Sequence, residues 1–92
     1  MLRITSRTDP SGIILDLEGK LAGPWVQEVE NCWRQIDIQN RRLRVNLRAV
    51  TFVDAAGAKL LDAMYRKGAE LEAGGCMTRA IVAEIQRGKV HE

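Results

Sequence analysis

The spacing of hydrophobic residues changes several times along this chain, and that change restricts the folds open to it. In residues 43–47 apolar and polar side chains alternate strictly, which is typical of a strand with one buried face. In residues 56–67 the apolar side chains recur every three or four positions, which is typical of an amphipathic helix. Short strands and helices that follow one another in this way indicate an α/β fold.

Five further segments complete the predicted order. Residues 2–6 and 13–18 are predicted strands, and the turn sequence Asp-Pro-Ser-Gly between them indicates a hairpin or a close antiparallel pair. The other predicted elements are a helix at 24–37, a short strand at 69–73 and a helix at 78–87. The order is β-β-α-β-α-β-α, and its strand–helix–strand units favour right-handed crossovers and a largely parallel sheet.

The strands alternate instead of being apolar throughout, which predicts a sheet that is covered on one face only. Leu43, Val45 and Leu47 should face a core. Arg44 and Asn46 should face away from it. We therefore expect a mixed, mostly parallel four-stranded sheet with the helices mainly on one face, and with the other face open to water or to a partner.

The length of 92 residues favours one domain over residues 1–92. Hydrophobic residues make up 46% of the chain and aromatic residues only 4%, so we expect an aliphatic core. The formal net charge of +2 is too small to indicate nucleic-acid binding. No apolar run is long enough to span a membrane, and the start of the chain is too polar for a signal peptide. We expect a cytoplasmic protein that neither binds nucleic acid nor inserts into a membrane.

The chain has few residues suited to catalysis or metal binding. Its one histidine, His91, is next to the last residue, which argues against a Ser-His-Asp triad and a Cys/His zinc site. Cys32 is interpreted as a small buried hydrophobe and Cys76 as an inert loop thiol. The glycines match no phosphate-binding loop. The sequence therefore predicts a protein that is not an enzyme, with no catalytic residue, metal or cofactor.

The segment from Val53 to Gly57 carries the strongest functional signal. Asp54 stands just before a predicted helix, where its carboxylate can cap exposed backbone N–H groups. Gly57, in the first turn, permits the close approach of another backbone. This segment is a corner at which a strand turns into a helix. A corner of this kind can also accept a phosphoryl group or the carboxylate of a partner.

At these residues the chain resembles the STAS domain family, named for sulfate transporters and anti-sigma factor antagonists. The centre of the resemblance is the pattern apolar-Asp-x-x-Gly-x-x-x-Leu, from Val53 to Leu61. The resemblance extends to the paired first strands, to Leu-x-Gly-Lys-Leu-Ala-Gly-Pro at 17–24, and to Gly-Ala-x-Leu at 68–71. It therefore covers nearly the whole chain.

The resemblance implies a non-catalytic domain that binds protein partners. In the anti-sigma factor antagonists a serine directly after the Asp is phosphorylated by an anti-sigma kinase, which adds about −2 charge and breaks the partner interface. Ala55 occupies that position here, and no hydroxyl group is present from Asp54 to Lys59. What the resemblance implies is therefore a partner-binding module without the usual serine switch.

Two readings follow from the missing serine. The domain either binds a regulatory protein constitutively, with an anti-sigma factor kinase as one candidate, or is a structural subunit of a transporter or signalling assembly. The second reading includes self-association as a homodimer. In the first, the binding surface comprises the corner and the exposed turn of the helix after it: Asp54, Ala55, Ala56, Gly57, Ala58, Lys59 and Asp62.

Other interpretations are weaker. A nucleotide-binding or small-ligand module would need a phosphate loop, which the chain lacks. By position, Asp54 also resembles the phospho-acceptor of a receiver domain, but near the first strand only Asp9 is available for the acidic pair such a domain needs. Residues 88–92 are all that follow the last predicted helix, where many STAS domains continue with another short element.

Two groups of prominent side chains are assigned structural roles. Trp25 and Trp33 are eight residues apart on one helix face, and we expect them to pack against the core. The arginines near the third predicted strand are expected on a solvated sheet face or edge: Arg41, Arg42, Arg44 and Arg48.

Overall fold

The computed structural model describes residues 2–36 and 42–87. Its elements are β1 (Leu2–Asp9), β2 (Gly12–Leu21), α1 (Pro24–Gln35), β3 (Arg42–Val53), α2 (Ala55–Arg66), β4 (Glu70–Ala73) and α3 (Cys76–Gln86). The predicted order is confirmed. Some sequence expectations lie outside the described residues: the end of the first helix at residue 37, Arg41, residues 88–92, and the side chain of Cys76.

The four strands form one sheet in the order β1-β2-β3-β4. β1 and β2 pair antiparallel, whereas β2, β3 and β4 run parallel. Asp9 builds the turn between the first two strands, since its carboxylate accepts the backbone N–H groups of Ser11 and Gly12, each at 2.9 Å. The mixed, mostly parallel sheet predicted from the sequence is therefore confirmed.

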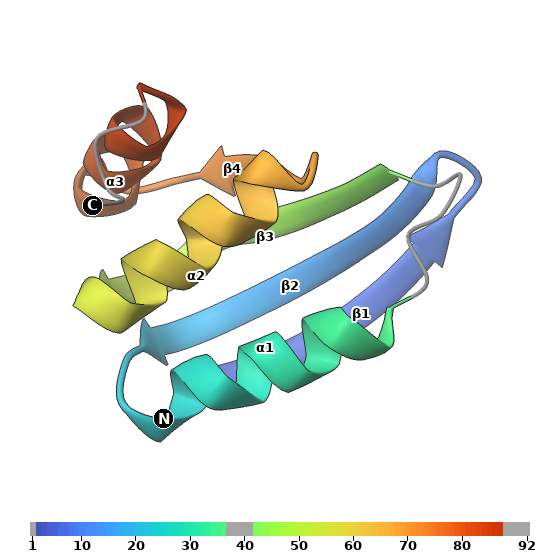
Figure 1. The fold of residues 1–92 in the computed structure, drawn as a ribbon, viewed down its shortest axis with the longest axis horizontal. Helices are drawn as coiled ribbons and strands as arrows, with labels where there is room; N and C mark the ends of the chain where they lie inside the picture. The colour runs from blue at the N-terminus through green and yellow to red at the C-terminus, as the bar shows by residue number, and fades with distance from the viewer. Residues whose placement is uncertain (1, 37–41, 88–92) are drawn as a thin grey trace.

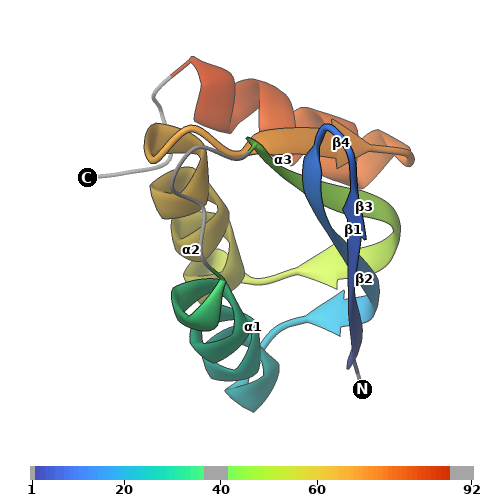
Figure 2. The same ribbon diagram turned by 90° about the vertical axis from the view of Figure 1, so that its right-hand side faces the viewer.

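Helices α1 and α2 cover the same face of this sheet (Figures 1 and 2). The core lies between the two layers, and no aromatic side chain is fully buried in the part of the chain described. Trp25 and Trp33 are half-buried and pack against the core, as expected. The largest fully buried side chains are Leu15, Leu17, Leu21, Leu47, Leu61, Met64, Ile85, Val29 and Val45.

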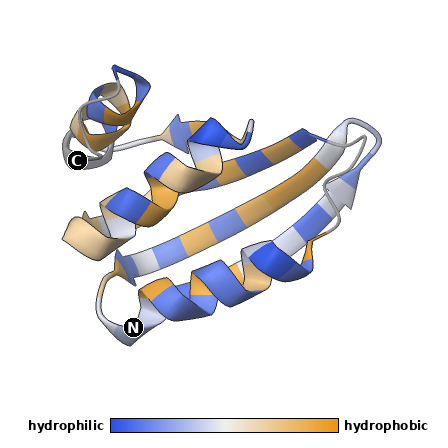
Figure 3. Ribbon diagram, viewed as in Figure 1, coloured by the Kyte–Doolittle hydropathy of each residue, from blue (hydrophilic) through white to orange (hydrophobic). Residues whose placement is uncertain are grey.

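The opposite face of the sheet carries polar side chains. The alternation of hydrophobic and hydrophilic residues along β2 and β3 is visible in Figure 3. Asp16 pairs with Arg7 and accepts a hydrogen bond of 2.8 Å from Asn46 Nδ2. Arg44 lies 3.6 Å from Glu70 on the neighbouring strand. These pairs across strands join side chains of opposite charge on this face.

Strand β3 is longer than the sequence indicated. The strand predicted at residues 43–47 is too short, because β3 runs from Arg42 to Val53. The pairing of β2 with β3 shifts register after Asp16, so that Glu18 lies opposite Ala49. This irregularity places two consecutive exposed residues, 48 and 49, before buried Val50. The strict alternation is lost at that point, which concealed the rest of the strand.

Helix α3 lies beside the second half of β3. β4 pairs only with Arg44–Leu47, and the chain then leaves the sheet. α3 contacts β3, β4 and α2, and it buries Val82 and Ile85 (Figure 2). The helix begins at Cys76, two residues before its predicted start. In its first turn, the Thr78 hydroxyl accepts the N–H of the preceding residue Gly75 at 3.1 Å.

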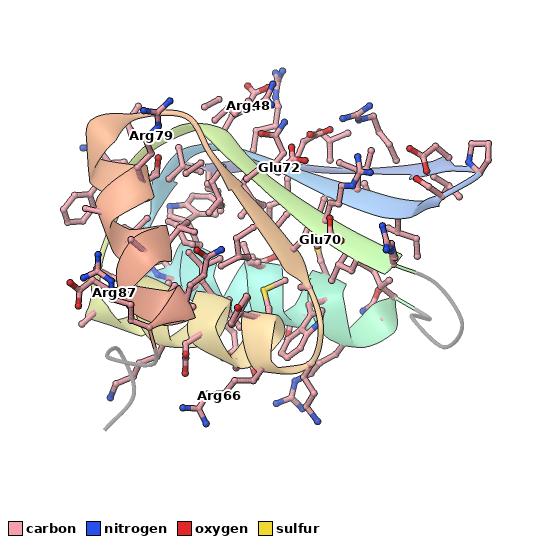
Figure 4. All side chains as sticks on the ribbon, turned by 90° about the horizontal axis from the view of Figure 1, so that it is seen from above. Arg48, Arg66, Glu70, Glu72, Arg79 and Arg87 are labelled. Carbon is pink, nitrogen blue, oxygen red and sulfur yellow. The ribbon has the colours of Figure 1, made fainter. Side chains whose placement is uncertain are left out.

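Replacing Gly74 with alanine should destabilise the fold. The new Cβ would lie 2.8 Å from the Cα of Arg48, a residue that Figure 4 shows on the side of the sheet away from α1 and α2. Overpacking of this kind lowers the free energy of unfolding by about 1–3 kcal/mol.

The adjacent glycine provides a matched control. A Cβ on Gly75 would meet nothing closer than the Thr78 Oγ1 at 3.9 Å, so Gly75→Ala should cost less than about 1 kcal/mol. Urea denaturation measures both changes. Equal losses for the two variants would contradict the packing reason given for Gly74.

Candidate functional site

The predicted corner lies where two parallel strands end together. In the sheet, Lys20 pairs with Phe52 and Leu21 pairs with Val53, so β2 and β3 finish at the same edge. Each strand then turns into a helix on the same face, β2 into α1 and β3 into α2 (Figure 1). The two strand-to-helix connections are therefore neighbours, and Asp54 lies at their junction.

The Asp54 side chain holds both connections. Its Oδ1 accepts the N–H of Gly57 at 2.7 Å, which caps the first turn of α2. Its Oδ2 accepts the N–H of Gly23 at 3.0 Å, directly before α1. The backbone N–H of Asp54 donates in turn to the carbonyl oxygen of Leu21 at 3.1 Å. The capping role predicted for Asp54 is confirmed, and the bond to Gly23 extends it.

These hydrogen bonds favour the ionised carboxylate. They lower the pKa of Asp54 from its ordinary value of 3.8, with the N–H of Gly23 as the largest cause and that of Gly57 as the next. Since each carboxylate oxygen already accepts a backbone N–H, Asp54 serves a structural role at this corner.

Gly57 is required by close packing. A Cβ at this position would lie 2.6 Å from the Leu21 carbonyl oxygen and 3.0 Å from Val53 Cγ1. The glycine therefore lets α2 approach the end of β2, as the sequence predicted. Together, Asp54 and Gly57 account for the Asp-x-x-Gly pattern in structural terms.

The exposed part of the corner is smaller than expected. Ala55, Ala56 and Lys59 are exposed, and Ala58 is half-buried. We refer to the three exposed residues as the corner surface. Asp54 is half-buried and Gly57 is buried, so their side-chain positions support the corner from within.

The exposure predicted for Asp62 is wrong. Asp62 is only 5% exposed, and its Oδ2 lies 3.1 Å from Arg66 Nε. Asp62 lies on the same side of α2 as the exposed residues Ala55, Lys59 and Arg66, so the helical period alone predicts an exposed side chain there.

The structure adds residues to this end of the molecule that the sequence reading did not select. Gly23 donates to Asp54, and Lys20 and Phe52 are exposed at the ends of β2 and β3. Phe52 was missed because it lies beyond the strand predicted at residues 43–47. Gly23 belongs to the segment at 17–24 that resembles the STAS pattern, and this resemblance was a signal for its importance.

Among the residues that the structure describes, no group of three or more His, Cys, Asp or Glu side chains could hold a metal ion. Of the helices described, none combines the length and the apolar character that crossing a membrane demands.

Comparison with known proteins identifies the fold. No protein-family model and no curated protein matches the sequence. The STAS domain of an antisigma-factor antagonist from Rhodobacter sphaeroides is similar over 99% of this chain and 92% of its own, with a TM-score of 0.53 and 19% identity. A structure described as a crystal structure analysis of Mglu is similar over 77% of this chain, with a TM-score of 0.64 and 19% identity. This chain spans only 19% of that protein.

These likenesses define a STAS-like α/β fold with a four-stranded sheet and three helices in the described residues. The similarity to the STAS domain extends over nearly the whole chain, as the sequence resemblance predicted. The receiver-domain interpretation is wrong. Receiver-type folds have a parallel sheet in a doubly wound order, whereas here β1 is antiparallel and the strands lie in sequence order.

Replacing Asp54 with alanine should lower the free energy of unfolding by about 1–2 kcal/mol at neutral pH, since it removes the cap of α2. It also removes the acceptor of the Gly23 N–H. Glu84→Ala is a control on the exposed surface of α3 and should change stability by less than about 0.5 kcal/mol. Chemical denaturation of both variants measures the difference.

The stability effect of Asp54→Ala should depend on pH. The folded pKa of Asp54 lies below its unfolded value, so its contribution is present above the unfolded pKa and is lost as pH falls through the folded one. The stability gap between wild type and variant should be constant above about pH 5 and should shrink below about pH 4. A gap that stays unchanged down to about pH 2 would contradict the role of the ionised carboxylate.

Proposed function

We propose that residues 1–92 form a non-enzymatic protein-interaction domain that binds a regulatory protein partner in the cytoplasm. The corner surface of Ala55, Ala56 and Lys59 forms the centre of the contact, and no serine phosphorylation switch controls it. Asp54, Gly57 and Ala58 hold the surface in place. The exposed position of Ala55 at the first turn of α2 is the observation that carries the proposal.

The chemistry of the corner supports binding over catalysis. A methyl group stands at position 55, where the resembling antagonists carry the serine. Asp54 is the one carboxylate at the start of α2, and both its oxygens accept backbone N–H groups. The exposed side chains therefore supply apolar contact and one positive charge, which suit recognition of a protein surface. An anti-sigma factor kinase is one candidate for the partner.

Similarity to part of a larger protein favours a second candidate function. The chain matches 19% of the Mglu chain, so a fold of this kind also occurs within a longer polypeptide. In this alternative the protein is a structural subunit of a transporter or signalling assembly and acts by self-association or complex formation. Light scattering on the purified protein tests the self-association, and a stable monomer at all concentrations would count against it.

Blocking the corner surface should abolish partner capture. In a crosslinked pull-down from extracts of the native cells, Ala56→Arg should lower the recovery of the partner at least about tenfold, because a long side chain replaces an exposed methyl group. Ala80→Arg is the matched control, since it places the same side chain on an exposed position of α3. If both variants recover the partner equally well, the contact lies elsewhere.

The wild-type protein should not be phosphorylated at the corner. Incubation with an anti-sigma factor kinase and ATP, followed by mass spectrometry, should find no phosphate on residues 54–57, since none carries a hydroxyl group. Ala55→Ser restores a hydroxyl at the position that resembles the phosphorylated serine. If the partner is a kinase of this class, that variant gains the phosphate. A phosphate on residues 54–57 of the wild type would overturn the switch-free reading.

A further inference from the structure

An exposed aromatic ring lies beside the corner surface. Phe52 is 42% exposed, although Val50 and Val53 on the same strand are buried. It stands two residues before Asp54, and its neighbour across the sheet is Lys20, which is also exposed. Phe52, Ala55 and Ala56 thus place three exposed apolar side chains within five residues of the chain, at one end of the sheet. Exposed apolar side chains near one another in this way are candidates for an interaction site.

The charged groups around this apolar surface are mainly positive. Lys20 from β2 and Lys59 from α2 are exposed, and neither forms an ion pair with any residue that the structure describes. The Asp54 carboxylate is engaged by two backbone N–H groups. Glu18 is exposed further back along β2, opposite Ala49. The N-terminus of α2 adds a partial positive charge, so this end of the molecule favours an acidic partner.

We infer that Phe52 is the central apolar contact of the partner-binding surface and that the partner presents an acidic segment with an apolar side chain. The apolar side chain packs on Phe52, and the carboxylates of the segment lie near Lys20 and Lys59. The inference rests on the proposed function and adds the chemical class of the partner segment. Interfaces commonly combine an aromatic anchor with a charged rim, the anchor supplying affinity and the rim selectivity.

Selection from a library of random dodecapeptides tests the inference without knowledge of the partner. Peptides enriched on the immobilised wild-type protein should carry Asp or Glu beside an apolar residue. Phe52→Ala should weaken their binding about tenfold or more, which is typical for loss of an aromatic anchor. The double variant Lys20→Glu, Lys59→Glu should weaken it as strongly, and added salt should weaken binding to the wild type.

Tyr65→Ala provides the matched control. Among the described residues, Tyr65 is the other large exposed hydrophobic residue, at 37%, and it lies ten positions along α2 from Ala55, or about 15 Å. Its removal should change peptide affinity less than about twofold. Circular dichroism confirms folding of each variant. If Phe52→Ala fails to fold, the lysine double variant still decides the outcome, because both lysines are exposed and unpaired among the described residues.

Several results would overturn the inference. They are enrichment of basic or uncharged peptides, the absence of any enrichment, and full binding by both Phe52→Ala and the lysine double variant. Self-association that Phe52→Ala abolishes would identify a second copy of this chain as the occupant and would also overturn the inference.

The variant Ala56→Arg separates this inference from the proposed function. If only Ala56→Arg abolishes binding, the corner surface binds a partner but Phe52 is not its anchor; if neither Ala56→Arg nor Phe52→Ala affects binding, the proposed site is wrong as well.

Discussion

The carboxylate of Asp54 joins the two strand-to-helix connections on which the helical layer depends. One oxygen fixes the first turn of α2 through Gly57, and the other fixes the residue before α1 through Gly23. The backbone of Asp54 also bonds to Leu21 at the end of β2. Two helices that begin far apart in the sequence therefore begin from one junction. Because the hydrogen bonds favour the charged form, the junction is most stable while the carboxylate is ionised.

This junction divides the corner into structural and exposed residues. Asp54 and Gly57, which carry the recognisable pattern, face inward or accept backbone hydrogen bonds. Ala55 and Ala56, the two positions between them, face solvent. The pattern itself therefore reports on the fold, and the intervening positions determine what a partner would meet. A chain can keep the first and change the second, so resemblance at Asp54 and Gly57 does not by itself carry the function.

Most of the architecture could be predicted because short-range patterns govern it. Alternation revealed Leu43–Leu47, turn chemistry revealed the first hairpin, and the helical period revealed α2. The errors arose where distant contacts override local pattern. A register shift against β2 breaks the alternation after residue 47 and hid the strand that exposes Phe52. The burial of Asp62 was missed because a helical period shows which side chains share a face of α2, and not which of them are covered.

Under the proposed function, the absence of a serine has an electrostatic consequence. A phosphoryl group at position 55 would place about −2 charge at the start of α2, close to Lys59, and would reverse the local potential. With Ala55 that route is closed. The lowered pKa of Asp54 keeps its charge constant across the physiological range, and two backbone N–H groups offset that charge. Under the proposed function, the corner then presents the same apolar and positive surface across the physiological pH range.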